Sequence, residues 1–235
     1  MSVRNGVLLC LSLLLVCGLL WQTRLERQHE TAFCPSRFAE QVLVIDAGHG
    51  GEDGGAVSAG GALESHINLA IARRVDAILG LFGAPVNMLR QEDISLHSEG
   101  ANTLRQKKNS DLHNRVAKVE EQDNAVLLSI HQNSYPDARY YGAQVFYAPT
   151  QGSEQLAVAM QEVLRLTLDE SNHRQAKRIP DTIFLMNHIS CPAILVECGF
   201  LSNPKEEQWL QDSGYQTKVA TALAGGFLQL QQTLT

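Results

Sequence analysis

A chain of 235 residues with a formal net charge of -6 and a sequence pI near 5.7 lacks the basic balance of a nucleic-acid-binding protein. Its 44% hydrophobic and 19% charged residues are typical of a globular protein and exclude a disordered or low-complexity chain. With an apolar N-terminal segment set aside, about 200 residues remain, which suits one compact domain without a second module.

Residues 1–24 are predicted to form a signal peptide or a membrane anchor. Arg4 precedes an almost unbroken apolar stretch over residues 6–21, and Arg24 and Arg27 follow it. The stretch is at the short end for a spanning helix, and no small-x-small cleavage site follows it. These features favour an uncleaved anchor and an extracytoplasmic location, with the protein either membrane-anchored or secreted.

The segment at residues 25–40 is polar and irregular, and we interpret it as a linker to a domain over residues 41–235. Three cysteines lie outside the apolar N-terminal run, namely Cys34, Cys191 and Cys198. An odd and scattered set of this kind predicts neither a disulfide framework nor a structural zinc knuckle.

Apolar patterns predict that strands alternate with helices through the domain. The expected strands lie at residues 41–45, 85–90, 125–130, 143–148 and 191–197, and the expected helices at 67–82, 111–122, 153–170 and 215–232. A further helix is expected after Asn203, with Asn203 as N-cap, Pro204 at the first position and Glu206 placed for a capping box. The alternation predicts an α/β fold, a single domain with a mostly parallel central sheet flanked by helices.

Polar residues lie where three of the predicted strands end: His49, His131 and Glu197. Parallel strands would bring them to one edge of the sheet, where ligands bind in such folds. Glu64 lies in the first turn of the next helix and can fold back to the same edge. Two imidazoles and a carboxylate, with a fourth position for water, are the ligands of a catalytic zinc site, and Glu197 would then be free to move protons.

From the residues alone, three of these four groups also have a simpler interpretation. His49 in a glycine-rich turn is compatible with a tight connection, and His131 with a hydrogen-bonded core histidine. Glu64 is compatible with an ordinary helix N-terminal acid, which the helix dipole favours. Glu197 is harder to explain, because a carboxylate in an apolar strand is costly to bury without a partner.

Four separated motifs add a resemblance to this argument: residues 46–56 (DAGHGGEDGGA), Glu64, residues 129–133 (SIHQN) and residues 195–203 (LVECGFLSN). In this order they resemble the zinc-dependent N-acetylmuramoyl-L-alanine amidases of the amidase 3 family, over roughly residues 41–232. The resemblance implies Zn²⁺ bound by His49, Glu64 and His131, with Glu197 as the catalytic residue. His66 is weighed as a competing ligand and Cys198 as a thiol nucleophile, and packing is the preferred role for Cys198.

The activity that this resemblance implies is hydrolysis of the amide bond between N-acetylmuramic acid and L-alanine, with peptidoglycan glycan strands and their stem peptides as substrate. Glu197 would take the proton of the attacking water and return it to the departing amine. Two alternatives stay open, a zinc peptidase that cuts the stem peptide and a catalytically silent wall-binding protein. The full set of four groups argues against the silent protein.

A narrower similarity concerns the biological role. The short chain, the basic segment at residues 174–179 and the apolar segment at residues 184–186 are similar to the germination-specific members of the family. That similarity implies spore cortex maturation, in which a partner deacetylase completes muramic-δ-lactam, and a location in the intermembrane space of the forespore. It also allows for an accessory or activator protein. The basic segment has two other interpretations, a solvated loop or a patch that contacts peptidoglycan carboxylates.

Overall fold

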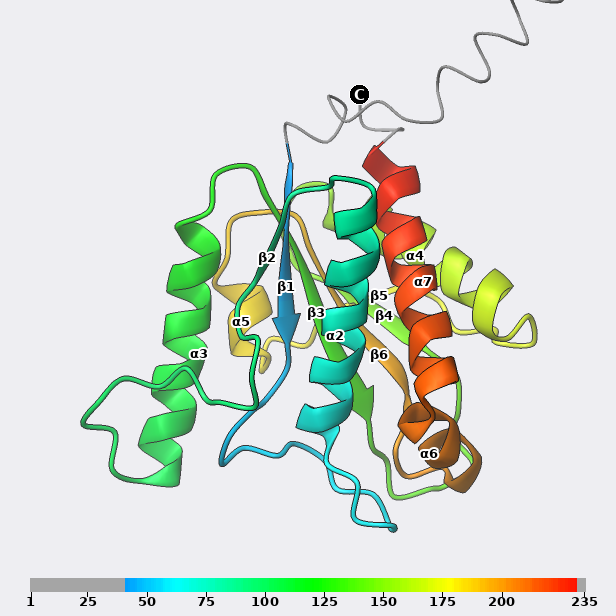
Figure 1. The fold of residues 1–235 in the computed structure, drawn as a ribbon, viewed down its shortest axis with the longest axis horizontal. Helices are drawn as coiled ribbons and strands as arrows, with labels where there is room; N and C mark the ends of the chain where they lie inside the picture. Colours follow the sequence, from blue (N-terminus) through cyan, green and yellow to red (C-terminus); the bar gives the residue numbers. More distant parts are fainter. Residues whose placement is uncertain (1–40, 232–235) are drawn as a thin grey trace, which may run out of the picture. The chain divides into compact units, whose positions relative to one another are not determined.

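A six-stranded sheet organises residues 41–231, the part of the chain that this computed structural model describes (Figure 1). The strands lie in the order β2-β1-β3-β6-β4-β5. Their bounds are β1 Val42–Ala47, β2 Val86–Met88, β3 Ala125–Asn133, β4 Gln144–Tyr147, β5 Lys177–Arg178 and β6 Ala193–Phe200. The prediction of an α/β domain with a central sheet is confirmed.

The sheet is mostly parallel, as predicted, and it reverses direction at β4. Strands β2, β1, β3 and β6 run parallel to one another, while β4 pairs antiparallel with β6 and parallel with β5. The connection from β3 to β4 contains no helix that would carry the chain back across the sheet, so β4 starts at the edge where β3 ends. That edge therefore carries the carboxyl ends of four strands and the start of β4.

Helices cover both faces of the sheet. Leu43 and Ile45 of β1 belong to the core beneath α2 (Glu64–Leu81), α4 (Ser153–Leu168) and α7 (Ser213–Gln231). Val44, which points to the other face, belongs to the core beneath α3 (Leu104–Glu120) and α5 (Phe184–Asn187). Figure 1 shows α2 beside α7, and the two helices contact each other.

Helix α3 begins at Leu104, seven residues before the predicted start at residue 111. The Thr103 hydroxyl accepts the N–H of Gln106, and the Gln106 side chain accepts the N–H of Thr103, which is a complete capping box. This cap starts the helix in a stretch that carries no apolar periodicity. The two-residue strand β5 and the four-residue helix α5 were not predicted, because elements this short have no periodic pattern.

The predicted helix after Asn203 is present as α6 (Pro204–Gln211), and the Asn203 side chain accepts the N–H groups of Lys205 and Glu206. The predicted capping-box role of Glu206 is wrong. Its buried carboxylate accepts the N–H of Gly142 at 2.9 Å and that of Phe200 at 2.8 Å. Glu206 therefore ties the connection before β4 to the end of β6.

Within residues 41–231, no helix is both long enough and apolar enough to cross a membrane. The predicted signal peptide or anchor at residues 1–24 and the linker at residues 25–40 lie outside the described residues. Both stay predictions.

Candidate metal centre and active site

The structure brings the three predicted ligands together at the carboxyl edge of the sheet. His49 lies in the turn after β1, Glu64 is the first residue of α2, and His131 lies near the end of β3. One potential ligand atom from each residue lies within 4.8 Å of the others. Nε2 of His49 is 3.4 Å from Oε2 of Glu64, and Nδ1 of His131 is 2.9 Å from Oε1 of Glu64.

The glycine-rich turn after β1 makes this convergence sterically feasible. A Cβ on Gly48 would lie 2.2 Å from Nε2 of His131, so no larger residue fits beside that imidazole. Gly55 has a φ of 69°, and a Cβ there would lie 2.6 Å from Oε2 of Glu64. His49 itself has a φ of 62°, an unusual conformation for a histidine that places its ring against Glu64.

The Glu64 carboxylate is buried and fully hydrogen-bonded. Oε2 accepts the N–H of Ala56 at 2.9 Å, while Oε1 accepts the N–H of Gln132 at 3.1 Å and Nδ2 of Asn68 at 3.2 Å. Burial opposes ionisation, yet hydrogen bonds to His131 and His49 hold the pKa of Glu64 well below its usual range. Glu64 is therefore a fixed anion between two imidazoles, not a solvated helix N-terminal acid.

Two further side chains orient the candidate ligands, and the sequence analysis missed both. Oδ2 of Asp53 lies 3.0 Å from Nδ1 of His49, which leaves Nε2 of that ring directed at Glu64. Although burial acts in the opposite direction, hydrogen bonds to Asp53 and Glu64 raise the pKa of His49 to about 9. Asn68 donates to the Gly48 carbonyl and to Glu64. Each residue lies four positions after its partner, a spacing visible in the sequence.

A buried ion pair stabilises the glycine-rich turn after β1. The Arg115 guanidinium contacts the carboxylate of Asp46 and donates to the carbonyl oxygen of His49 at 2.7 Å. Ser129 donates its hydroxyl to Asp46 at 2.7 Å, and Nε of Arg115 lies 2.6 Å from Asp111. Burial alone would lower the pKa of Arg115, but Asp46 and Asp111 raise it, so the guanidinium stays charged.

Glu197 lies beside His131, because the two residues are register partners in the parallel strands β3 and β6. Its Oε2 atom is buried and makes no hydrogen bond to any described residue. Burial raises the pKa of Glu197 to about 7; the Glu64 charge adds to this, and His131 and His49 oppose it. A carboxylate with these properties, next to the candidate metal ligands, can both accept and donate a proton near neutral pH.

All four groups line one cavity of about 470 Å³. Ile183, Phe184 and Met186, in and just before α5, contribute apolar lining to the same cavity. The site therefore combines a polar cluster with an apolar lining on which a substrate can pack.

Neither alternative residue joins this cluster. Nε2 of His66 lies 3.0 Å from Oδ2 of Asp93, and His66 is exposed at the surface. Cys198 is buried in the core on the opposite face of β6 from Glu197, and burial strongly raises the pKa of its thiol. The thiol is therefore neutral and inaccessible, which supports the packing role.

Residues 43–229 match the Amidase_3 family, described as N-acetylmuramoyl-L-alanine amidase. The germination-specific N-acetylmuramoyl-L-alanine amidase of Bacillus subtilis strain 168 is 40% identical over 190 residues, which cover 80% of this chain and 79% of the relative. The matched range contains all four candidate site residues.

Solved structures agree with the sequence comparison. The CwlD amidase from Clostridioides difficile, solved in complex with the GerS lipoprotein, superposes with a TM-score of 0.79 at 37% identity and covers 83% of this chain and 100% of that chain. The amidase AmiC2 of Nostoc punctiforme superposes with a TM-score of 0.69 at 28% identity, covering 82% and 98% respectively.

Proposed function

The chain belongs to the Amidase_3 family of N-acetylmuramoyl-L-alanine amidases, and from this premise we propose that it hydrolyses the N-acetylmuramic acid to L-alanine bond of peptidoglycan with the help of zinc. Amidase activity follows from the family. The zinc dependence rests on one observation, the convergence of His49, Glu64 and His131 within 4.8 Å.

The donor set fits zinc. Two imidazole nitrogens and one carboxylate oxygen are the protein ligands of many catalytic zinc sites, which keep a further position open. Asp53, hydrogen-bonded to the far nitrogen of His49, is the outer partner that such histidines usually have. A zinc ion held by these residues supplies Lewis acidity, which activates water and polarises an amide carbonyl.

Glu197 is the proposed proton carrier. It accepts the proton of the attacking water and delivers it to the nitrogen of the departing L-alanine, so that the amine leaves in neutral form. Its buried Oε2 has no competing partner among residues 41–231, and burial raises its pKa above the ordinary range of a glutamate, which favours its role as a proton donor as well as an acceptor. A single carboxylate suffices because the oxygen that gives up the proton and the nitrogen that receives it belong to the same tetrahedral intermediate.

The apolar lining suits the groups beside the scissile amide. The lactyl carbon on one side of that bond and the alanine Cα on the other each carry a methyl group. Ile183, Phe184 and Met186 supply apolar surface for such groups in the same cavity as the four polar residues.

Mass analysis of fragments from purified peptidoglycan tests the proposal. We expect stem peptides with free L-alanine amino termini, and loss of this product together with zinc in His49→Ala and His131→Ala. Glu197→Gln should keep zinc and lose turnover by about a hundred-fold or more. Peptides cut internally and still joined to sugar would instead establish a stem-peptide peptidase. Binding without any cleavage would establish a silent wall-binding protein.

The proposed biological role is spore cortex maturation, in which a partner deacetylase completes muramic-δ-lactam. Similarity to the germination-specific amidase supports this role, and the solved complex of CwlD with a lipoprotein supports an accessory protein. The test is expression in a spore former that lacks its own germination-specific amidase. Cortex without muramic-δ-lactam, despite an active enzyme, would contradict the assignment.

The proposed location is extracytoplasmic, with membrane attachment through residues 1–24. A reporter fused to residues 1–30 should be exported and should sediment with membranes. A soluble cytoplasmic reporter would contradict this location.

A further inference from the structure

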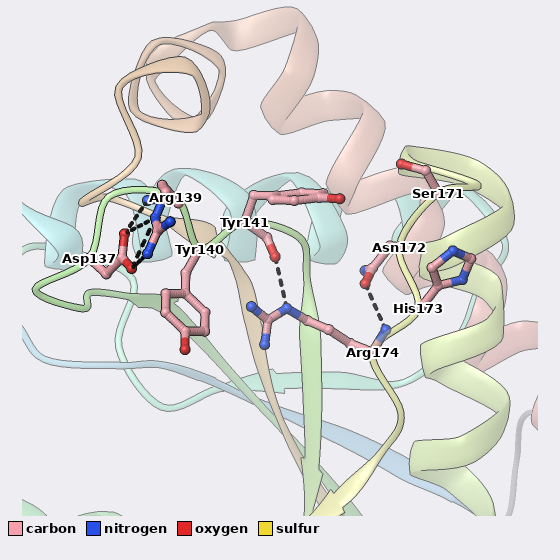
Figure 2. Close-up of a pocket in the computed structure, with 8 residues that line it drawn as sticks. All are labelled: Asp137, Arg139, Tyr140, Tyr141, Ser171, Asn172, His173 and Arg174. Atoms are coloured by element: carbon pink, nitrogen blue, oxygen red, sulfur yellow. Dashed lines mark hydrogen bonds and ion pairs between the residues drawn. The ribbon is translucent and has the colours of Figure 1, made fainter.

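A second cavity, of about 450 Å³, lies outside the site described above (Figure 2). The connection between β3 and β4 lines one side with Tyr140 and Tyr141, and the segment before β5 lines the other. Figure 2 shows the side chain of Arg174 reaching from that segment toward Tyr140 and Tyr141. Neither the amide chemistry nor the metal ligands account for this cavity.

The second cavity lies at the same edge of the sheet as the catalytic cavity. Gln144, which starts β4, is the register partner of Glu197, so the residues just before β4 lie beyond that edge. Asn133 and Ser134 line the catalytic cavity, and the ring of the next residue, Tyr135, lies 4.7 Å from the ring of Tyr140. The connection between β3 and β4 therefore contributes residues to both cavities, and both lie at the same edge of the sheet.

This connection is held firmly by the turn after β6. The N–H of Tyr135 donates to the hydroxyl of Ser202 at 3.0 Å. Nδ2 of Asn203 donates to the carbonyl oxygens of Ala138 and Tyr140 at 3.0 and 3.2 Å. Ser202 and Asn203 belong to the last family motif. Their side chains hold this connection, the Asn203 side chain also caps α6, and neither contacts the candidate metal ligands. A ligand therefore meets a largely preformed surface.

Arg174 is held in place without an ion pair, although its charge acts on the buried carboxylate of Glu206, whose two oxygens accept the N–H groups of Gly142 and Phe200. Its Nε donates to the carbonyl oxygen of Tyr141 at 2.8 Å, and its guanidinium carbon lies 4.7 Å from the centre of the Phe200 ring. Its two terminal nitrogens make no hydrogen bond or ion pair within residues 41–231. The neighbouring Arg139 differs, because Asp137 binds its guanidinium through two nitrogens. Arg174 is thus a pre-oriented cation with free donors, the arrangement that binds carboxylates.

We infer that this second cavity is a subsite for a carboxylate of the peptidoglycan stem peptide, with Arg174 as the anion-binding residue and Tyr140 and Tyr141 as packing surfaces. The inference rests on the proposed function, because cleavage at the muramoyl amide requires that the peptide extend away from the catalytic cavity. Stem peptides carry free carboxylates along that length. The subsite deepens the specificity of the same reaction and takes no part in its chemistry.

A binding experiment tests the subsite without turnover. The probe is a free stem tetrapeptide, compared with the same peptide carrying amidated carboxylates, and each is titrated into the wild-type chain, Arg174→Gln and Arg165→Gln by calorimetry. Arg165 is a matched control, since it lies on α4 and pairs with Glu162. We expect Arg174→Gln alone to bind the free-carboxylate peptide about tenfold more weakly. The amidated peptide should bind all three proteins alike.

Kinetics on an intact disaccharide-peptide separate the subsite from the proposed function. Arg174→Gln should raise KM by about the same tenfold and leave kcat within about twofold, because the lost contact is uniform binding. If the wild-type chain shows the Arg174-dependent affinity but releases no L-alanine termini, the proposed function fails and the subsite stands. If cleavage proceeds and Arg174→Gln matches wild type in affinity and KM, the subsite is overturned.

Two further outcomes bear on the ligand class. Equal affinity of the wild-type chain for free and amidated peptides, with tight binding of a peptide-free glycan, would overturn the carboxylate assignment in favour of a sugar subsite. Arg174→Lys covers the case in which Arg174→Gln fails to fold, since it keeps the charge and loses the planar fork. It should retain a reduced preference for the free-carboxylate peptide, and no preference at all would contradict the inference.

Discussion

Each oxygen of Glu64 accepts a backbone N–H, from Ala56 on one side and Gln132 on the other. A glutamine at this position must therefore turn its NH₂ group toward one of those two donors, whichever way the amide is oriented. One buried N–H then loses its acceptor, which costs about 1–3 kcal/mol. For a domain of this size, we expect Glu64→Gln to lower the Tm of the metal-free protein by roughly 2–12 °C.

The matched control is Glu197→Gln. Oε2 of Glu197 has no hydrogen-bond partner among the described residues, so the amide displaces no donor and removes a partly desolvated charge. Its Tm should equal or exceed that of the wild-type chain. The assay is thermal unfolding in chelator at pH 7, followed by zinc titration, in which Glu64→Gln alone should bind weakly. A metal-free Glu64→Gln as stable as wild type would refute the hydrogen-bond reasoning.

Two other predictions concern the turn after β1 and the buried ion pair beside it. Gly48→Ala should keep the fold but lose zinc and activity, because its Cβ would lie 2.2 Å from the imidazole of His131. The control is Gly80→Ala, which has open space at its Cβ and should add about 0.5–1 kcal/mol of stability at full activity. Normal zinc content in Gly48→Ala would contradict the packing argument. Burial raises the pKa of Asp46, but Arg115 outweighs this effect and holds that pKa below the ordinary 3.8. The ion pair therefore stabilises the fold above about pH 4, and its contribution disappears as the pH falls through the lowered pKa. Asp46→Asn should therefore cost about 3–5 kcal/mol in urea unfolding at pH 7, and the difference from wild type should shrink in acid; a pH-independent difference would contradict it.

Local patterns predicted most of the fold, whereas the direction of β4 is set by long-range pairing. The buried strands and the amphipathic helices have periods that a short window contains. The direction of β4 does not, because it depends on pairing with β6, which lies about 50 residues further along the chain. The early start of α3 was readable in principle, since Thr103 and Gln106 have the spacing of a capping box.

The residues of the candidate site also fall into two groups, those that the sequence predicts and those that only the structure reveals. His49, His131 and Glu197 were predictable because polar residues at strand ends stand out in apolar surroundings. Arg115 was not predictable, because it lies on α3, 66 positions after His49, and only the fold brings it to the turn after β1. The sequence allowed the basic segment with Arg174 to be a patch that contacts carboxylates, among other interpretations. Only the structure shows that the Arg174 guanidinium has no carboxylate bound to it, whereas Asp137 binds the guanidinium of Arg139.

The strand order also constrains when activity can arise during synthesis of the chain. β6 is the last strand in the chain, yet it lies between β3 and β4 in the sheet and carries Glu197. A chain that emerges with its N-terminus first can pair β1 with β3, but it has an unfilled gap where β6 belongs until residue 200 has emerged. The incomplete chain therefore lacks Glu197 at the carboxyl edge, and a hydrolase of this topology completes its site only when nearly all of its sequence is available to fold.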